Sequence, residues 1–325
     1  ELGYGIGSGD TVGNFGLHRG SSHATIAPTD TITNNARAIL STRVLSTGVL
    51  PTDSVQIYKN GVSLTLDTSG AGWLTAGHYA TSTVPLDIGA RRDGNDAAYP
   101  DDVTPDAHHA GDIVEIILYT EPLNTAQRII IENYLSAKYG VPLAAGTKYY
   151  WTPFINYIQD VAGIGREADG MHTEANSAGL ILVDHGFLQD SGDYVLVGHK
   201  TSTNGITIGD LAKISGVASR WERIWQIDRT DAGIESDGVT LKFDFDDAGI
   251  AETPEGIYTL LYRSLSLGNF GDAFQASSHI VQNQVIFSDV TGLINGYYTL
   301  GKFEETGYDL FDSNQPGGPV YAFEN

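Results

Sequence analysis

Short segments in which hydrophobic and polar residues alternate run through most of the chain, separated by glycine, asparagine, aspartate and proline. This pattern is typical of antiparallel β structure rather than of β-α-β units. The clearest case is the hairpin Val55–Leu64, where Asn60 and Gly61 supply the two positive-φ residues of a type I′ turn. Two further strands are predicted at Ala38–Val44 and Leu86–Gly89.

The segment Asp112–Tyr119 is apolar at nearly every position, which predicts a strand covered on both faces. In the second half, Val239–Phe245 alternates cleanly between apolar and polar residues, as a half-buried strand does. Regular strand spacing there predicts a β-sandwich of about seven or more strands. The predicted strands are Gly179–Val183, Tyr194–His199, Ile224–Arg229, Val239–Phe245, Ile257–Arg263, Gln284–Phe287 and Tyr297–Phe303.

One helix is predicted, from about Asn124 to Lys138. Asn124 and Gln127 have the spacing of a capping box. Gly140 is expected as a left-handed residue that ends the helix, and Pro142 prevents its continuation. The stripe expected to face a β core consists of Ile131, Tyr134, Leu135 and Lys138. Packing that closes a β-sandwich is the expected role of this helix.

The small residues Ala144–Thr147 predict a boundary between two domains, at 1–143 and 144–308. Residues 309–325, which include Gln315-Pro316-Gly317-Gly318-Pro319, predict a linker or tail. The expected fold class is all-β, with a sandwich and one closing helix followed by a second β-sandwich domain.

Three stretches, Gly111–Tyr119, Leu123–Arg128 and Ile131–Gly140, resemble the closing strand and helix of the laminin-G-like, concanavalin-type jelly-roll domains. Tyr58–Gly61 and Ile88–Arg91 fit the earlier hairpin and strand of that module. Such modules occur in large secreted proteins of Bacteroidetes and other aquatic bacteria. The resemblance implies a concanavalin-like jelly roll over 1–143, whose amino-terminal strands are expected to be missing, cleaved or supplied by another chain.

The second half is similar to the uncharacterised β domain that often follows that module. The similar stretches are Asp160–Arg166, Tyr194–His199 and Arg220–Ile227. The resemblance implies a secreted surface protein, often an adhesin-like one, and supplies no catalytic residue. If the first jelly roll lacks strands, its open edge predicts assembly, with Leu2–Gly16 or Tyr308–Asn325 as the exchanged segment.

Acidic residues outnumber basic ones by 40 to 18 in the 325 residues, so the formal net charge is −22. This charge excludes a nucleic-acid binder that works by neutralising phosphates. No apolar run approaches the roughly 18 residues of a membrane span, so no membrane insertion is expected. The many glycine and tyrosine residues, the scarcity of lysine and the single methionine favour an extracellular or cell-surface location. The absence of cysteine excludes disulfides and thiol catalysis.

The motifs of the common catalytic sites are missing from the sequence. There is no Gly-x-Ser-x-Gly elbow, no Walker loop and no Glu-x-Asp-x-x-Glu strand of the laminarinase-like jelly rolls. The nearest acidic cluster, Asp244-x-Asp246-Asp247, is predicted on the outer face of a strand, where solvated carboxylates are the rule. The sequence therefore predicts a protein that is not an enzyme.

Calcium is a better candidate metal than zinc, because hard oxygen ligands are abundant and acidic loops cluster, whereas no His-x-x-x-His helix is present to bring two imidazoles together. His108 and His109 are expected in a surface loop, and His172, His185 and His199 at strand ends or turns. The Arg91–Asp106 loop offers the oxygen ligands that calcium prefers. The alternative is a solvated acidic loop, which the neighbouring Arg91 and Arg92 favour, and the stretch Asp228–Asp237 is a weaker candidate. The candidate calcium ligands are Asp93, Asn95, Asp96, Asp101 and Asp102.

Trp73, with Tyr79 near it in sequence, is the candidate platform for a glycan, since sugar rings stack on exposed aromatic faces. Trp221 and Trp225 are predicted to be buried. The function expected is that of a noncatalytic extracellular surface protein with a structural or adhesive role, which assembles with itself, as in a filament, or with another surface subunit. The alternatives are a carbohydrate-binding accessory module of a polysaccharide-degrading system and an enzyme of polysaccharide breakdown.

If calcium binds the acidic loop only in the folded state, it stabilises the protein by mass action. A chelator is then expected to lower the melting temperature, and millimolar calcium to restore it, as measured by scanning calorimetry. Identical melting curves in chelator and in calcium would show that calcium does not stabilise the folded protein.

Overall fold

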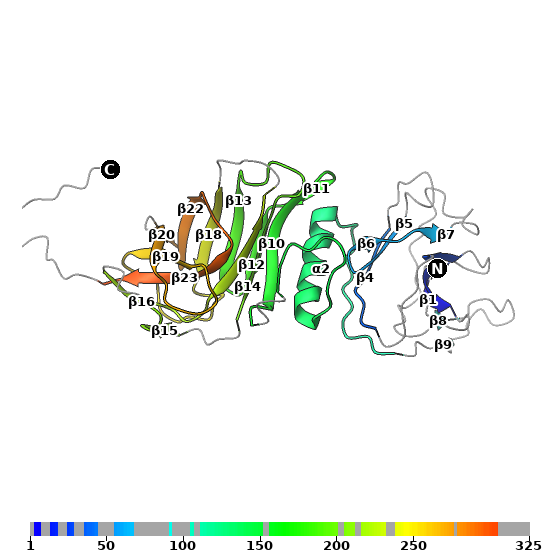
Figure 1. The fold of residues 1–325 in the computed structure, drawn as a ribbon, viewed down its shortest axis with the longest axis horizontal. Coiled ribbons are helices and arrows are strands. Elements are labelled where there is room, and N and C mark those ends of the chain that lie inside the picture. Colours follow the sequence, from blue (N-terminus) through cyan, green and yellow to red (C-terminus); the bar gives the residue numbers. More distant parts are fainter. Residues whose placement is uncertain are drawn as a thin grey trace, which may run out of the picture.

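The structure is a computed structural model that describes residues 3–7, 14–18, 25–28, 36–44, 55–67, 91–92, 105–106, 111–151, 156–200, 205–211, 216–231, 238–275 and 278–304. Within these residues it is an all-β protein with one helix, α2 (Thr125–Tyr139), as Figure 1 shows. The predicted fold class, an all-β sandwich with one helix, is confirmed.

Two antiparallel sheets form the second half of the chain. The larger, nine-stranded sheet contains β10 (Gln159–Glu167), β11 (Gly170–His172), β14 (Tyr194–His199), β15 (Ile206–Thr207), β16 (Val217–Trp221), β17 (Trp225–Thr230), β19 (Tyr258–Arg263), β20 (Asp272–Gln275) and β23 (Gly296–Phe303). The five-stranded sheet has the order β12 (Glu174–Ser177), β13 (Leu180–His185), β18 (Gly238–Asp244), β22 (Gln284–Val290) and β21 (His279–Val281). Every strand that the sequence predicts in this half is present.

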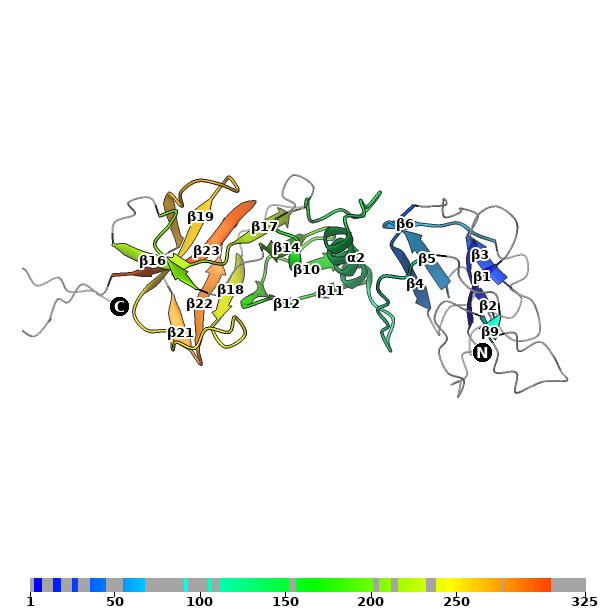
Figure 2. The ribbon, with the colours of Figure 1, turned by 90° about the horizontal axis from the view of Figure 1, so that it is seen from below.

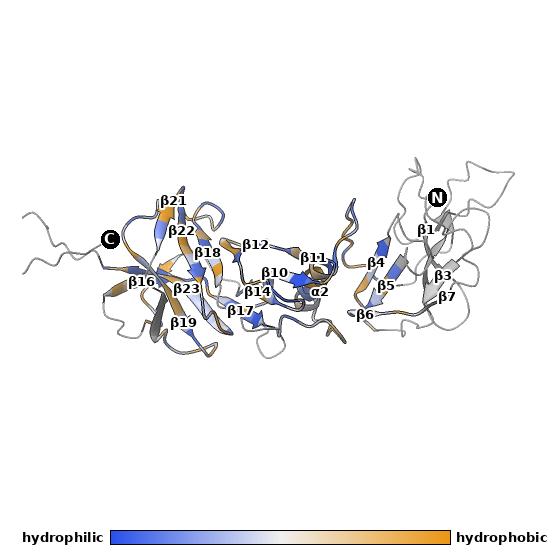
Figure 3. Cartoon of the chain, turned by 90° about the horizontal axis from the view of Figure 1, so that it is seen from above, coloured by the Kyte–Doolittle hydropathy of each residue, from blue (hydrophilic) through white to orange (hydrophobic). Residues whose placement is uncertain are grey.

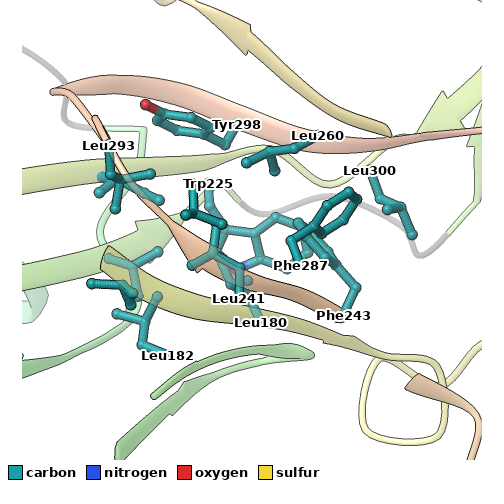
Figure 4. Close-up of a cluster of buried hydrophobic side chains, with 14 of the residues drawn as sticks. Leu180, Leu182, Trp225, Leu241, Phe243, Leu260, Phe287, Leu293, Tyr298 and Leu300 are labelled. Atoms are coloured by element: carbon teal, nitrogen blue, oxygen red, sulfur yellow. The ribbon is translucent and has the colours of Figure 1, made fainter. Parts of the chain in front are cut away.

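The two sheets pack face to face (Figure 2), and the side chains between them form one hydrophobic core. Along β18, Val239, Leu241 and Phe243 are buried, and Lys242 on the opposite face is partly exposed, as the alternation predicts. Figure 3 shows hydrophobic and hydrophilic residues side by side along these strands. In Figure 4, Phe243 and Phe287 from the smaller sheet meet Trp225 from the larger one. The prediction that Trp221 and Trp225 are buried is confirmed, with exposed fractions of 4% and 0%.

Strand β14 is buried on both faces. Val195 and Val197 belong to the core between the sheets, whereas Tyr194 and Leu196 point the other way and pack against α2. The neighbouring strand β10 has a glycine next to the Tyr194 ring. A Cβ atom on Gly165 would lie 2.3 Å from that ring, so a side chain at this position would clash with it. The helix therefore covers the outer face of the nine-stranded sheet at β10 and β14 (Figure 1).

The ends of α2 follow the sequence signals. Asn124 caps the first turn and exchanges hydrogen bonds with Gln127 in a capping box, with N–O distances of 2.9 and 3.0 Å. Gly140 ends the helix in the left-handed conformation, with φ of 64°. The predicted buried stripe was wrong, because Lys138 is exposed and Ile131, Tyr134 and Leu135 are only partly buried. The buried apolar residues of α2 are instead Ala126, Ile129, Ile130 and Ala137.

A second, polar face of α2 contacts a three-stranded sheet of β4 (Leu40–Val44), β5 (Val55–Lys59) and β6 (Val62–Ser63). The buried Glu132 accepts hydrogen bonds from Arg128 at 2.6 Å and from Ser41 of β4 at 2.7 Å. The Arg128 guanidinium lies 3.8 Å from the centre of the Tyr58 ring on β5. Because both of its faces are covered, more than one stripe of α2 is buried.

The turn between β5 and β6 is the predicted one, with positive φ at Asn60 (49°) and Gly61 (85°). The remaining strands near the amino terminus are β1 (Gly3–Gly7), β2 (Asn14–His18), β3 (Thr25–Pro28), β7 (Leu66–Asp67), β8 (Arg91–Arg92) and β9 (Pro105–Asp106). The predicted strand at Leu86–Gly89 lies outside the described residues. The domain boundary at Ala144–Thr147 stays a prediction.

Asn133 ties α2 to the segment that follows it. Its buried side-chain amide donates to the carbonyls of Ile129 and Gly146, both at 2.8 Å. Its carbonyl oxygen accepts from the backbone N–H groups of Lys148 and Tyr149, at 2.8 and 2.9 Å. All four hydrogen-bonding positions of one side chain are thus used. They hold the chain in the path that brings Tyr149 into the core beneath the helix.

Replacing Asn133 with leucine leaves the Gly146 carbonyl and the N–H groups of Lys148 and Tyr149 without this partner. The Ile129 carbonyl keeps its hydrogen bond within the helix. We expect Asn133→Leu to lower the free energy of unfolding by at least about 3 kcal/mol, since each buried unpaired group costs about 1–3 kcal/mol. Asn133→Asp keeps both acceptor contacts and should fall between the leucine variant and the wild type. Urea unfolding followed by circular dichroism measures both. A leucine variant within about 1 kcal/mol of the wild type would contradict this role.

Candidate functional site

The candidate glycan platform and the candidate calcium ligands all lie outside the described residues, namely Trp73, Tyr79, Asp93, Asn95, Asp96, Asp101 and Asp102. Their roles stay predictions. In the part of the chain that the structure describes, no group of three or more histidine, aspartate or glutamate side chains is arranged to hold a metal ion.

Three histidines lie at strand ends, as predicted. His172 ends β11, His185 ends β13 and His199 ends β14. His199 is also buried, and its ring nitrogens lie 2.7 Å from an Asp160 carboxylate oxygen and 2.8 Å from the Lys200 carbonyl oxygen. Asp160 has a φ of 46° and occupies an irregularity in the pairing of β10 with β14. This pair is a structural contact that fixes the end of β14.

The segment Ile113–Tyr119, which we call the apolar strip, is the most unusual surface of the described chain. The prediction of a doubly covered strand at Asp112–Tyr119 was wrong, because the segment forms no strand and pairs with none of the described strands. Figure 1 draws it as a plain trace that leads into α2. Six of its seven side chains are exposed large hydrophobic groups, with exposed fractions from 37% at Ile117 to 73% at Val114.

Beside the apolar strip lies a groove of about 350 Å³. Its walls come from the strip, from α2, from β10 and from β11 and β12, and most of the lining residues are apolar. Ile131 and Tyr134, the helix residues expected to face a core, line this groove instead. Its apolar lining includes Ile117, Tyr119, Ile131, Tyr134, Val161 and Ala175.

The single charge of the strip is neutralised within the chain. Glu115 lies 3.2 Å from the Lys138 ammonium in an ion pair, and Tyr134 donates to its carboxylate at 3.4 Å. Partial desolvation acts to raise the pKa of Glu115, but hydrogen bonds from Tyr139 and Lys138 outweigh it and hold the pKa below its ordinary value. Glu115 is therefore a carboxylate at neutral pH, and Lys138 compensates its charge.

A buried carboxyl group lies on the helix-facing side of the nine-stranded sheet. Asp228, in β17, accepts hydrogen bonds from the Tyr150 backbone N–H at 2.7 Å and from the Gln226 side chain at 3.3 Å. Burial nevertheless raises the pKa of Asp228 above its ordinary value. The weaker calcium candidate that began at Asp228 is therefore wrong at this residue, which is a buried strand residue and not a loop ligand.

Perturbed carboxyl groups often mark active sites. Asp228, however, lines neither the groove beside the apolar strip nor a second cavity, which lies beside β15 and β16. Its surroundings are the buried rings of Tyr149 and Tyr297, whose own pKa values are raised, first of all by burial. Asp228 is a polar group enclosed where β17 packs against the segment that follows α2.

Comparison with known proteins adds no identification. No protein-family model, no curated protein and no solved structure matches the chain. The class that the structure itself defines is an all-β sandwich protein with one helix packed on its outer face. The resemblance of its sequence to laminin-G-like modules stays a prediction.

The raised pKa of Asp228 predicts how the stability of the protein depends on pH. Its pKa is raised in the folded state, so the folded protein holds the proton more tightly than the unfolded chain, and stability falls as the pH rises through the raised pKa. Asp228→Asn removes this loss while an amide oxygen still accepts from Tyr150. The variant is expected to be more stable than the wild type at pH 7, with a gain that shrinks as the pH falls.

Urea unfolding between about pH 4 and pH 8 measures this gain. Asp190→Asn is the matched control, because Asp190 is exposed, and it should show no gain that grows with pH. An Asp228→Asn variant that is less stable than the wild type at every pH would show that the buried carboxylate is a net stabilising group.

Proposed function

We propose that the chain is a noncatalytic structural or adhesive module of an extracellular or cell-surface protein, and that copies of it associate through the apolar strip. The observation that carries the proposal is the exposure of Ile113–Tyr119 next to an open apolar groove. Contiguous exposed apolar surface with strand-forming residues is typical of protein interfaces. The acidic, lysine-poor composition supports an extracellular location.

A second copy of the chain is the partner that fits the strip. In an antiparallel pair centred on Ile116, Val114 of each copy lies opposite Leu118 of the other, and Glu115 lies opposite Ile117. The two glutamates are then not opposed, and each is compensated by its own Lys138. Such a pair has two-fold symmetry and uses the same surface on both copies.

Electrostatics makes this association depend on salt. Two copies that each carry a net charge of −22 repel one another over distances near the Debye length, which is about 10 Å at 0.1 M salt. Contacts through the strip are apolar and gain from salt, whereas the repulsion is screened. Association should therefore strengthen as ionic strength rises. Among the described residues, none forms a helix long and apolar enough to cross a membrane.

The proposal is tested by sedimentation velocity over a range of protein and salt concentrations. The wild type is expected to exceed its monomer mass of 34.8 kDa as either concentration rises. The double variant Val114→Lys with Leu118→Lys should remain monomeric, since both side chains are exposed and their replacement leaves the core unchanged.

The matched control is Leu265→Lys with Leu267→Lys, which changes two exposed leucines, 71% and 80% exposed, and adds the same charge. It should associate as the wild type does. A wild type that stays monomeric under all conditions, or a control that loses association equally, would refute the role of the apolar strip.

A further inference from the structure

The groove beside the apolar strip contains a histidine, the side chain that most readily changes its charge near neutral pH. This residue is His172, the last residue of β11, and it is partly buried. It pairs with Gly165 of β10, and residues directly opposite each other on paired strands project from the same face of a sheet. Gly165 faces the Tyr194 ring beneath α2, so His172 lies on the face of the sheet that the helix covers.

The groove offers little to stabilise a charge on this ring. Apart from His172, the ionisable side chains that line it are Glu174 of β12, Tyr119 of the strip and Tyr134 of α2, and the lining residues of β10 are uncharged. Within the described residues, the His172 ring has no hydrogen-bond or ion-pair partner. Partial burial lowers the pKa of His172, and attraction to Glu174 offsets this only in part. The ring is therefore neutral at pH 7.

Two further carboxylates belong to the elements that form the groove, and both are already paired. Asp169, which lies between β10 and β11, forms an ion pair with Arg43 at 2.9 Å. Glu115 of the strip forms its ion pair with Lys138. Neither is therefore available to compensate a charge on the histidine.

Association through the apolar strip would change the surroundings of His172. Ile117 and Tyr119 belong both to the strip and to the lining of the groove, so a second copy seated on the strip also covers part of the groove. Covering the groove removes water from the ring. A neutral ring tolerates this far better than a charged ring without a partner does.

We propose that His172 makes the association of two copies depend on pH, because the neutral ring permits it and the protonated ring opposes it. This inference rests on the proposed function. The associated pair binds fewer protons than two separate copies, so the histidine weakens association as the pH falls through its pKa in the separate copies. That pKa lies below the ordinary value of 6.5. A two-fold pair contains two such histidines, and their effects on the dissociation constant multiply.

A second effect of pH has the opposite sign. As carboxylates become protonated, the net charge of −22 becomes smaller and the repulsion between copies weakens. Protonation of Glu174 adds to this effect, because it removes a negative charge from the groove. A chain without an ionisable group at position 172 shows this second effect alone.

Sedimentation velocity from about pH 7.5 to about pH 5, at constant ionic strength, therefore compares the wild type with His172→Gln and His172→Leu. Both variants are expected to associate more tightly as the pH falls. The wild type should lag behind them, so that the ratio of its dissociation constant to that of His172→Gln rises at least about fivefold over this range. Circular dichroism at each pH verifies that the variants are folded.

His185→Gln is the matched control. His185 also ends a strand, β13, but it is exposed and does not line the groove. This variant should follow the wild type at every pH.

Parallel changes in the dissociation constants of the wild type and of both His172 variants would overturn this inference and leave the proposed association in place. Loss of the pH response in His185→Gln to the same extent would also overturn it, since the effect would then not belong to the groove. A wild type that is monomeric at every pH would instead refute the proposed function, and this inference with it.

Discussion

The burial of β14 on both faces is the constraint on which the rest of the described structure depends. Its residues point alternately to opposite sides, so Val195 and Val197 require a second sheet, while Tyr194 and Leu196 require a cover on the outer face. The five-stranded sheet provides the first and α2 the second. Because α2 precedes the sandwich in sequence, the chain must return beneath it, and Asn133 fixes that return by binding Gly146, Lys148 and Tyr149. The helix is thus part of the sandwich's packing.

Features that depend on local chemistry could be predicted from the sequence. The Asn60-Gly61 turn, the capping box of Asn124 and the left-handed Gly140 each follow from the conformational preferences of a few adjacent residues. The strands of the second half could also be predicted. Burial of one strand face between two sheets requires an apolar residue at every second position, as at Val239, Leu241 and Phe243.

Features that depend on which segments meet could not be predicted. The sequence of an apolar run such as Ile113–Tyr119 does not show whether other parts of the chain cover its side chains. In the structure these side chains are exposed. The stripe on α2 was misread because two layers cover the helix and not one. Asp228 looked like the start of an acidic loop, but the pairing of β17 with β14 and the contact with Tyr150 bury it. The groove that combines Tyr119 with His172 exists only in the folded chain, since these two residues are far apart in sequence.

The apolar strip and the core between the two sheets are made of different residues. The core is close-packed around Trp225, Phe243 and Phe287, which come from both sheets (Figure 4). Because no side chain of the strip belongs to this core, substitutions in the strip change the exposed surface and leave the packing of the sandwich in place. An effect of such substitutions on self-association can therefore be separated from an effect on folding.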